Sequence, residues 1–433
     1  MRDSRLRTLF IIVFIDLLGF SLILPLLAFY ASAYGATPAV VGLLVASYAA
    51  AQLIGAPILG RLSDRHGRRP ILLLSVFGTL LGFLMLGLAE PIGAALAGLF
   101  SGLGLAVSLE AAVIGVLFAS RILDGLTGGN ITVAQAYIAD ITDNQGRARA
   151  LGFLGAAFGL GFIIGPAVGG TLSIYGYSVP AFAAAAMSLI ALLSIYFALP
   201  ESLPEEERRA RAQAPRSAFT VAALTEAFRL PRVSPLLVTR FLFGLSFAMM
   251  QTIFPLYGQQ RFGLTAQTTG YILTYIGIII VLVQGVGIGV MTARWRESRL
   301  IVFMIGLFGL AVLAWALVPS VAWLLVAFLP LAIAGGSLNT LISSVLSKSV
   351  YPEEIGGILG LSTSVESLTR VIAPVLGGYL LGSVGSAAPG VASALLMAVL
   401  FPYAYFRLIA RPAPPLAERT PEGASELAQH TQA

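Results

Sequence analysis

Long apolar runs recur along the whole chain, and short polar or charged segments separate them. Within each run the apolar residues are continuous and do not alternate with polar ones, which favours helices over strands. About 20 helical residues cross a hydrocarbon core of about 30 Å, and the runs have about this length. We therefore expect twelve membrane-spanning helices, at about 7–30, 38–60, 71–89, 112–139, 149–172, 179–199, 236–257, 266–291, 300–318, 322–347, 356–382 and 388–409.

The composition agrees with this pattern. Of the 433 residues, 58% are hydrophobic and only 11% are charged, and the mean hydropathy is +0.91. A soluble chain would carry about 25% charged residues to cover its surface. In lipid only helices and closed barrels satisfy the hydrogen bonds of their own backbone N–H and C=O groups. The expected fold class is therefore an all-α integral membrane protein with two pseudo-symmetric six-helix bundles.

Basic residues gather in alternate connections between the expected spans, and the other connections are nearly bare apart from Arg261. The positive-inside rule then predicts that both termini are cytoplasmic. This asymmetry explains the net charge of +6 and the pI of about 9.7 without a nucleic-acid partner. We expect a multi-pass protein of the cell membrane, monomeric and surrounded by the lipid bilayer.

A charged segment that contains proline divides the spans six and six. We predict an N-terminal bundle at 1–199, a cytoplasmic linker at 200–235, a C-terminal bundle at 236–410 and a disordered polar tail at 411–433.

The two halves repeat each other weakly. Pro25 corresponds to Pro255 at an offset of 230, and the run Gly165–Gly170 corresponds to Ala373–Gly378 at an offset of 208. Two parallel repeats are expected where a transport path runs between two bundles. The drop in offset predicts about 22 extra residues within about 90–111, as an extracytoplasmic extension of the third and fourth helices or a shallow hairpin. A thirteenth span there would move the arginines near residue 147 to the wrong side of the membrane.

Residues 60–70 read Gly-Arg-Leu-Ser-Asp-Arg-His-Gly-Arg-Arg-Pro. Glycines permit a tight loop between two spans, and the arginines hold it at the cytoplasmic face. The loop resembles the signature of the major facilitator superfamily, in which it latches the two bundles together on the cytoplasmic side. The resemblance implies a gate motif made of Gly60, Asp64, Arg65, Gly67 and Arg68, with the latch carried by Asp64 and Arg68. A simple solvated charge run is the alternative.

Two further motifs resemble the same superfamily. The fourth helix, Arg121 to Asn130, is similar to its helix-4 motif, and the helix-5 motif of its antiporter branch is matched by Gly161, Gly165, Pro166, Gly169 and Gly170. The first helix around Asp16 looks like that of the drug/proton antiporters, tetracycline exporters among them. Small residues also let helices pack closely, so packing alone is the competing interpretation. Tetracycline as the substrate is doubtful, because the third, eighth and ninth helices lack the ionisable residues that we associate with those exporters.

Few ionisable residues lie deep inside the expected spans: Asp16, Arg121, Asp124, Glu366 and Arg370. A charge at the membrane centre costs about 2.5–3.5 kcal/mol, so each should face a partner or a water-filled space. In one interpretation Arg121–Asp124 and Glu366–Arg370 are structural ion pairs. In the other, Asp16 and then Glu366 exchange protons, with Arg121 and Asp124 assisting, as the resemblance implies for Arg121. Glu366 could instead attract a cationic substrate.

These patterns predict a secondary transporter, with proton-coupled export of a small drug-like molecule or metabolite as the leading hypothesis. The alternatives are a sugar or metabolite symporter or uniporter, and a non-transporting receptor or scaffold. With no cysteine and two histidines in polar segments, we expect no metal site, cofactor or enzymatic centre. The expected cavity-lining residues are Phe20, Asn130, Gln135, Tyr137, Phe243, Met250, Gln251 and Arg370.

Overall fold

The computed structural model describes residues 2–208, 228–351 and 354–412, and this part of the chain is helical without a strand. Ten of its helices or joined helix runs are long and apolar enough to cross a membrane. Two more spans complete the predicted twelve. The span at 109–141 is broken near its middle, and the span at 355–383 carries a row of polar side chains. Neither has a long uninterrupted apolar stretch. The predicted all-α membrane fold is confirmed.

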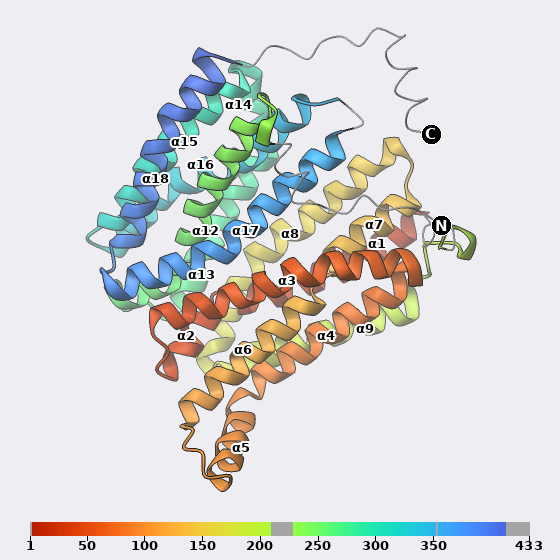
Figure 1. Cartoon of the computed structure of the whole chain (residues 1–433), viewed down its shortest axis with the longest axis vertical. Coiled ribbons are helices and arrows are strands. Elements are labelled where there is room, and N and C mark those ends of the chain that lie inside the picture. Colours follow the sequence, from red (N-terminus) through yellow and green to blue (C-terminus); the bar gives the residue numbers. More distant parts are fainter. Residues whose placement is uncertain (1, 209–227, 352–353, 413–433) are drawn as a thin grey trace.

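The first half of the molecule forms the lower bundle in Figure 1. Its elements are α1 (Arg2–Ile23), α2 (Leu26–Ala33), α3 (Pro38–His66), α4 (Arg68–Gly87), α5 (Ala89–Gly102), α6 (Leu109–Thr127), α7 (Asn130–Ile141), α8 (Asn144–Leu172), the short 3-10 turn η1 (Ser173–Tyr175) and α9 (Ser178–Ala198).

The second half forms the upper bundle. Its elements are α12 (Ser234–Phe262), α13 (Ala266–Leu282), the π-helical turn η2 (Val283–Gly287), α14 (Ile288–Arg294), α15 (Glu297–Leu317), α16 (Val321–Lys348), α17 (Ile355–Ser383), α18 (Ala388–Tyr405) and the π-helical turn η3 (Phe406–Ala410).

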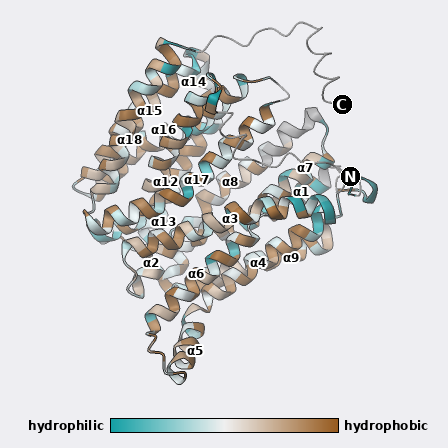
Figure 2. Ribbon diagram, viewed as in Figure 1, coloured by the Kyte–Doolittle hydropathy of each residue, from teal (hydrophilic) through white to brown (hydrophobic). Residues whose placement is uncertain are grey.

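The two ends of the molecule differ in charge. We call the Arg-rich end the one at which α1 begins, marked N in Figure 1, and at which the connections α3–α4 and α14–α15 lie. The Arg-poor end carries the connections α2–α3 and η1–α9. Figure 2 shows apolar residues along most of the helix length, with hydrophilic residues concentrated near the N-terminus. This distribution fits a molecule whose long side faces lipid.

The halves meet through two helix pairs, α3 with α17 and α8 with α13. At the Arg-poor end of the first pair the backbones nearly touch. A Cβ atom on Gly42 would lie 2.2 Å from the carbonyl oxygen of Pro374, and one on Gly378 would lie 2.3 Å from that of Pro38. Only glycine fits at such a distance, because any side chain would overlap the opposing backbone. We call this contact the first seam.

The second pair repeats the arrangement. A Cβ atom on Gly270 would lie 2.1 Å from the carbonyl oxygen of Pro166, and one on Gly170 would lie 2.9 Å from that of Ala266. Pro166 and Gly170 correspond to Pro374 and Gly378 at the offset of 208 found in the sequence. The internal repeat therefore produces two equivalent backbone seams, one on each side of the molecule.

Toward the Arg-rich end the same helices separate. Cβ atoms on Gly152 and Gly155 of α8, and on Gly356 and Gly360 of α17, would meet no heavy atom within 4 Å. Figure 1 shows the two bundles diverging in this direction. The structure is therefore closed at the Arg-poor end and opens toward the Arg-rich end.

The extra residues of the first half form α5, which folds back onto the start of α6 at the Arg-poor end. Contact between the two is close, since a Cβ on Gly93 would lie 2.6 Å from a methyl carbon of Val113. In Figure 1, α5 stands away from the other helices.

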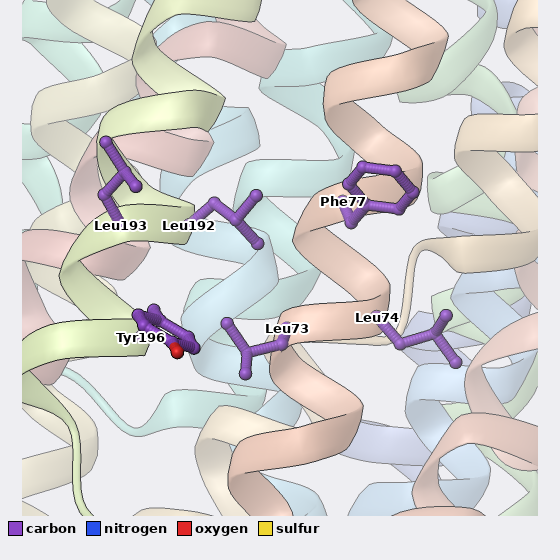
Figure 3. A pocket seen from close by; sticks show the side chains of 6 residues that line it. All are labelled: Leu73, Leu74, Phe77, Leu192, Leu193 and Tyr196. Atoms are coloured by element: carbon purple, nitrogen blue, oxygen red, sulfur yellow. The ribbon is translucent and has the colours of Figure 1, made fainter.

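A groove between α4 and α9 lies on the outer surface of the first bundle (Figure 3). Its lining is almost wholly apolar: Leu73, Leu74, Phe77, Leu192, Leu193 and Tyr196. Several of these side chains are exposed, as expected where acyl chains cover the protein. The apolar lining of the groove fits a lipid-facing surface better than a polar substrate site.

The first seam predicts that adding one methyl group at Gly42 separates the two halves at the Arg-poor end. Gly42→Ala should force α3 and α17 apart at the Arg-poor end, because its Cβ would overlap the Pro374 carbonyl. The chain has no cysteine, so spin labels on cysteines introduced at Ala33 and Ser383 report the distance across that end. The distance should lengthen. Gly152→Ala, with open space around its Cβ, is the matched control. An unchanged distance in Gly42→Ala would show that the seam does not hold the end closed.

Candidate functional site

The fourth span is interrupted where the sequence predicted one continuous helix. α6 ends at Thr127 and α7 begins at Asn130, with Gly128 and Gly129 between them. Side chains of neighbouring helices satisfy the carbonyls that the break frees. Ser75 Oγ donates to the Thr127 carbonyl, and Gln52 Nε2 donates to that of Gly128 at 3.1 Å. Backbone breaks at membrane depth are tolerated where such partners exist.

The break places the side chain of Asn130 against Asp16. Asn130 Nδ2 donates a hydrogen bond to Asp16 Oδ2, and Asn130 is the first residue of α7. The carboxyl group is thus held near a helix N-terminus, where the helix dipole favours negative charge. Asp16 is only 6% exposed, and its Oδ1 has no hydrogen-bond partner among the described residues. The sequence predicted that Asp16 faces a partner or a water-filled space; in this conformation its partner is the Asn130 amide, and the side chain is enclosed.

Close packing of α8 on α1 fixes the position of Asp16. Cβ atoms on Gly165 and Gly169 would lie 2.0 Å from Ser21 Oγ and 2.3 Å from the Leu22 carbonyl. Ser21 Oγ also donates to the Gly161 carbonyl at 2.7 Å. The helix-5 motif therefore packs one face on α1, while Gly170 continues onto α13 in the second seam. The helix-5 motif therefore contacts both α1, the helix that carries Asp16, and α13 of the other half.

The predicted pair of Arg121 and Asp124 is present, with Nη1 and Oδ2 3.1 Å apart. Both side chains are 3% exposed, and the Arg121 guanidinium lies 5.4 Å from the ring centre of Phe83. Asp124 also hydrogen-bonds to Thr79 and interacts electrostatically with Asp16. Arg121 Nη2 has no partner among the described residues. The pair is balanced in charge but leaves one donor unused.

The second bundle contains a larger charged cluster. Glu366 binds Arg370 at 2.7 Å through one carboxylate oxygen and Arg240 at 2.5 Å through the other. Arg240 also donates to Asn339 Oδ1 at 2.6 Å. The exposed fractions of the side chains are 8% for Arg240, 23% for Glu366 and 61% for Arg370. We call Arg240, Asn339, Glu366 and Arg370 the α17 cluster.

Sequence reasoning missed Arg240. It lies six residues after the start of α12 and was not counted among the ionisable residues deep inside the spans. The informative signal was Glu366 itself, because a buried carboxylate has room for a second cation beyond the arginine on its own helix. The predicted Glu366–Arg370 pair is present, but it is one part of a three-residue bridge.

An aromatic pair of the first half, Phe20 and Tyr48, lies near both charged groups. The rings of Phe20 (α1) and Tyr48 (α3) lie 5.2 Å apart, and Gln52 Nε2 donates to the Tyr48 hydroxyl at 3.1 Å. Tyr48 interacts electrostatically with Asp16 and Asp124 of its own half and with Arg370 of the other. The polar groups of the two halves therefore converge around Tyr48.

Three expected cavity residues instead pack inside the bundles. Tyr137 is fully buried and donates to the Pro200 carbonyl at 2.8 Å. Phe243 and Met250 are 3% and 4% exposed, and the Phe243 ring packs 5.3 Å from Phe308. Their spacing could not distinguish a cavity wall from a bundle core. Of the others, Phe20, Asn130 and Gln251 are partly buried, and Gln135 is exposed.

The gate-motif residues form a network at the Arg-rich end. Arg68, 3% exposed, binds Asp64 at 2.8 Å, Asp140 of α7 at 2.9 Å and Ser63 Oγ at 2.7 Å. These partners of Arg68 belong to the first half. Gly60 is partly buried and Arg65 is exposed. The latch between halves stays a prediction.

Glu201, which follows α9, caps the start of α4. Its oxygens accept from the backbone nitrogens of Arg68 at 2.8 Å and Arg69 at 3.1 Å. Gly67 adopts a positive φ of 102°, and a Cβ there would lie 2.5 Å from Glu201 Oε2. The second glycine of the motif is required by this cap, which the sequence analysis did not predict.

The α17 cluster predicts that losing its buried carboxylate destabilises the protein more than losing a carboxylate at an exposed ion pair. Glu366→Gln should lower the free energy of unfolding by about 3 kcal/mol, because it leaves the buried Arg240 without a carboxylate. Glu297→Gln, which removes a partner of the exposed Lys348, should cost about 1 kcal/mol or less. Thermal unfolding of both variants in the same detergent makes the comparison. Equal melting temperatures would mean that the cluster does not stabilise the second bundle.

Comparisons with known proteins agree with this architecture. A family model described as Major Facilitator Superfamily matches residues 9–370 and 284–431. The chain is 31% identical over 387 residues to Multidrug resistance protein 2 of Bacillus subtilis (86% of this chain, 89% of that one). It is 29% identical over 386 residues to the class H tetracycline resistance protein of Pasteurella multocida (87% and 89%). The crystal structure of the human organic anion transporter MFSD10 superposes with a TM-score of 0.63 at 22% identity, covering 93% of this chain and 99% of that one. The chain belongs to the Major Facilitator Superfamily.

Proposed function

We propose that this protein is a proton-coupled exporter of a small lipophilic molecule, working by alternating access with Asp16 as the coupling carboxyl. Membership of the superfamily supports a secondary transporter. Relatives named for tetracycline and multidrug resistance support export as the direction. The substrate, the monomeric state and the proton as the driving ion belong to the proposal.

The observation that carries the proposal is the environment of Asp16. Burial disfavours its charged form, while the Asn130 amide and the N-terminus of α7 favour that form. The unpartnered Oδ1 is available to carry a proton. These opposing influences suit a carboxyl group that takes up and releases a proton during transport.

The positive-inside rule assigns the Arg-rich end to the cytoplasm. In that orientation the present conformation is inward-facing, and the two seams form the outer gate. Opening the seams moves α8 relative to α13, and α8 packs directly on the helix that carries Asp16. Proton access to Asp16 is thereby tied to the motion of the halves. Arg121 then biases the charge of the adjacent carboxyls, and Glu366 is the second candidate for coupling.

Asp16→Asn should abolish proton-driven accumulation of substrate in inside-out vesicles and keep substrate counterflow. The amide cannot exchange a proton, but it preserves the size of the side chain. A panel of lipophilic compounds tested for growth protection supplies the substrate, and Glu110→Gln, an exposed acid, is the control. Accumulation in Asp16→Asn that still collapses with the proton gradient would move coupling to Glu366. Proton-independent equilibration in the wild type would indicate a uniporter.

Asp64→Asn should slow conformational exchange and leave substrate affinity nearly unchanged. The substitution weakens the Arg68 network, which reaches α7 at Asp140, about 15 Å along that helix from Asn130, the partner of Asp16. Counterflow rates measure exchange, and equilibrium binding measures affinity, with Glu110→Gln, an exposed acid outside the gate motif, as the control. A large loss of affinity at an unchanged rate would contradict a gating role.

A further inference from the structure

An arginine near the middle of a membrane-spanning helix is largely exposed. Arg370 is the sixteenth of the 29 residues of α17, about 22 Å from the start of the helix at about 1.5 Å per residue. Its side chain is 61% exposed. A guanidinium at this depth must meet water or a counter-charge, because lipid solvates neither the charge nor its donors.

The helix periodicity shows which space Arg370 faces. Residues 370, 374 and 378 are spaced four apart and share one face of α17. Pro374 and Gly378 on this face form the first seam with α3. Arg370 lies one turn further toward the Arg-rich end, where it interacts electrostatically with Tyr48 of α3. It therefore stands beside the seam, at the closed end of the space between the halves.

The charges of the α17 cluster do not balance. Two guanidiniums share one carboxylate, and both Glu366 oxygens are already occupied by arginines. Among the described residues only Nη2 of Arg370 is used in this bridge. The sequence analysis left open that Glu366 attracts a cationic substrate. With both oxygens occupied, Glu366 is poorly placed to do so. The cluster instead offers one positive charge in excess, with unused donors.

We propose that Arg370 binds the anionic group of the transported molecule and that the substrate class is lipophilic organic anions, such as aromatic carboxylates. A guanidinium pairs with a carboxylate through two parallel hydrogen bonds. The rings of Phe20 and Tyr48, 5.2 Å apart in the first half, offer an apolar face for an aromatic body. An interior-negative membrane potential drives such a substrate outward. The proposal rests on the proposed transport function but not on proton coupling through Asp16.

The test is equilibrium binding to the purified full-length protein in nanodiscs. Three probes share one ring system: 2-naphthoate (anion), 2-naphthamide (neutral) and 2-naphthylmethylammonium (cation). We expect saturable binding of 2-naphthoate and weaker binding of the other two. Arg370→Gln should weaken 2-naphthoate binding by roughly 10- to 100-fold with little effect on the amide, and Arg370→Lys should retain part of the affinity.

Arg299→Gln is the matched control, because Arg299 is an exposed arginine at the start of α15. Arg370→Gln leaves Glu366 paired with Arg240, and thermal unfolding checks that the variant is folded. The proposal is overturned if 2-naphthoate does not bind, binds no better than the amide or the ammonium, or binds equally to folded Arg370→Gln. These measurements use no proton gradient, so their failure is distinct from a failure of coupling at Asp16.

Discussion

The cost of charge inside an apolar medium is the constraint on which the rest of this structure depends. Most deep ionisable side chains have a partner of opposite charge, as an apolar medium requires. Arg121 and Asp124 neutralise each other, and Arg240 is buried against Glu366 and Asn339. Asp16 and Arg370 do not fit this scheme fully. One has an unpartnered oxygen and the other an exposed guanidinium. Both interact electrostatically with Tyr48. In a transporter, polar atoms without a protein partner are available to bind a proton or a substrate.

The second organising element is contact between backbones at the two seams. Small residues allow helices in lipid to approach closely, where a hydrophobic driving force between helices is absent. The prolines support this arrangement, because each carbonyl that faces a seam glycine belongs to a proline or to a residue near a helix start. Among the described residues no ion pair joins the helices of either seam, so the seams can separate without breaking one. A gate of this kind suits a protein that must alternate between two states of similar free energy.

The sequence predicted the class of fold, the twelve spans and the repeat, because apolar runs and recurring glycine and proline positions can be read from the sequence without knowing how the helices pack. It also predicted both intrahelical ion pairs, since residues three or four apart must share a helix face. It could not predict that Tyr137, Phe243 and Met250 are core residues, or that Arg240 and Glu201 contribute to the charged networks. Which side chains are buried and which reach a charged partner depends on how each helix is rotated about its axis relative to its neighbours. The break at Gly128 was also missed, because it depends on Ser75 and Gln52 from neighbouring helices. The latch role of Asp64 remains a prediction.

The central claim is that the buried Asp16 carboxyl changes its protonation when the transporter binds substrate and its halves move. Infrared difference spectroscopy of the reconstituted protein, with and without a substrate identified by the growth panel, tests it directly. The account predicts a change in the carboxylic-acid C=O stretch that disappears in Asp16→Asn and persists in Glu366→Gln. A carboxyl signal that persists in Asp16→Asn, or the absence of any carboxyl signal in the wild type, would contradict it.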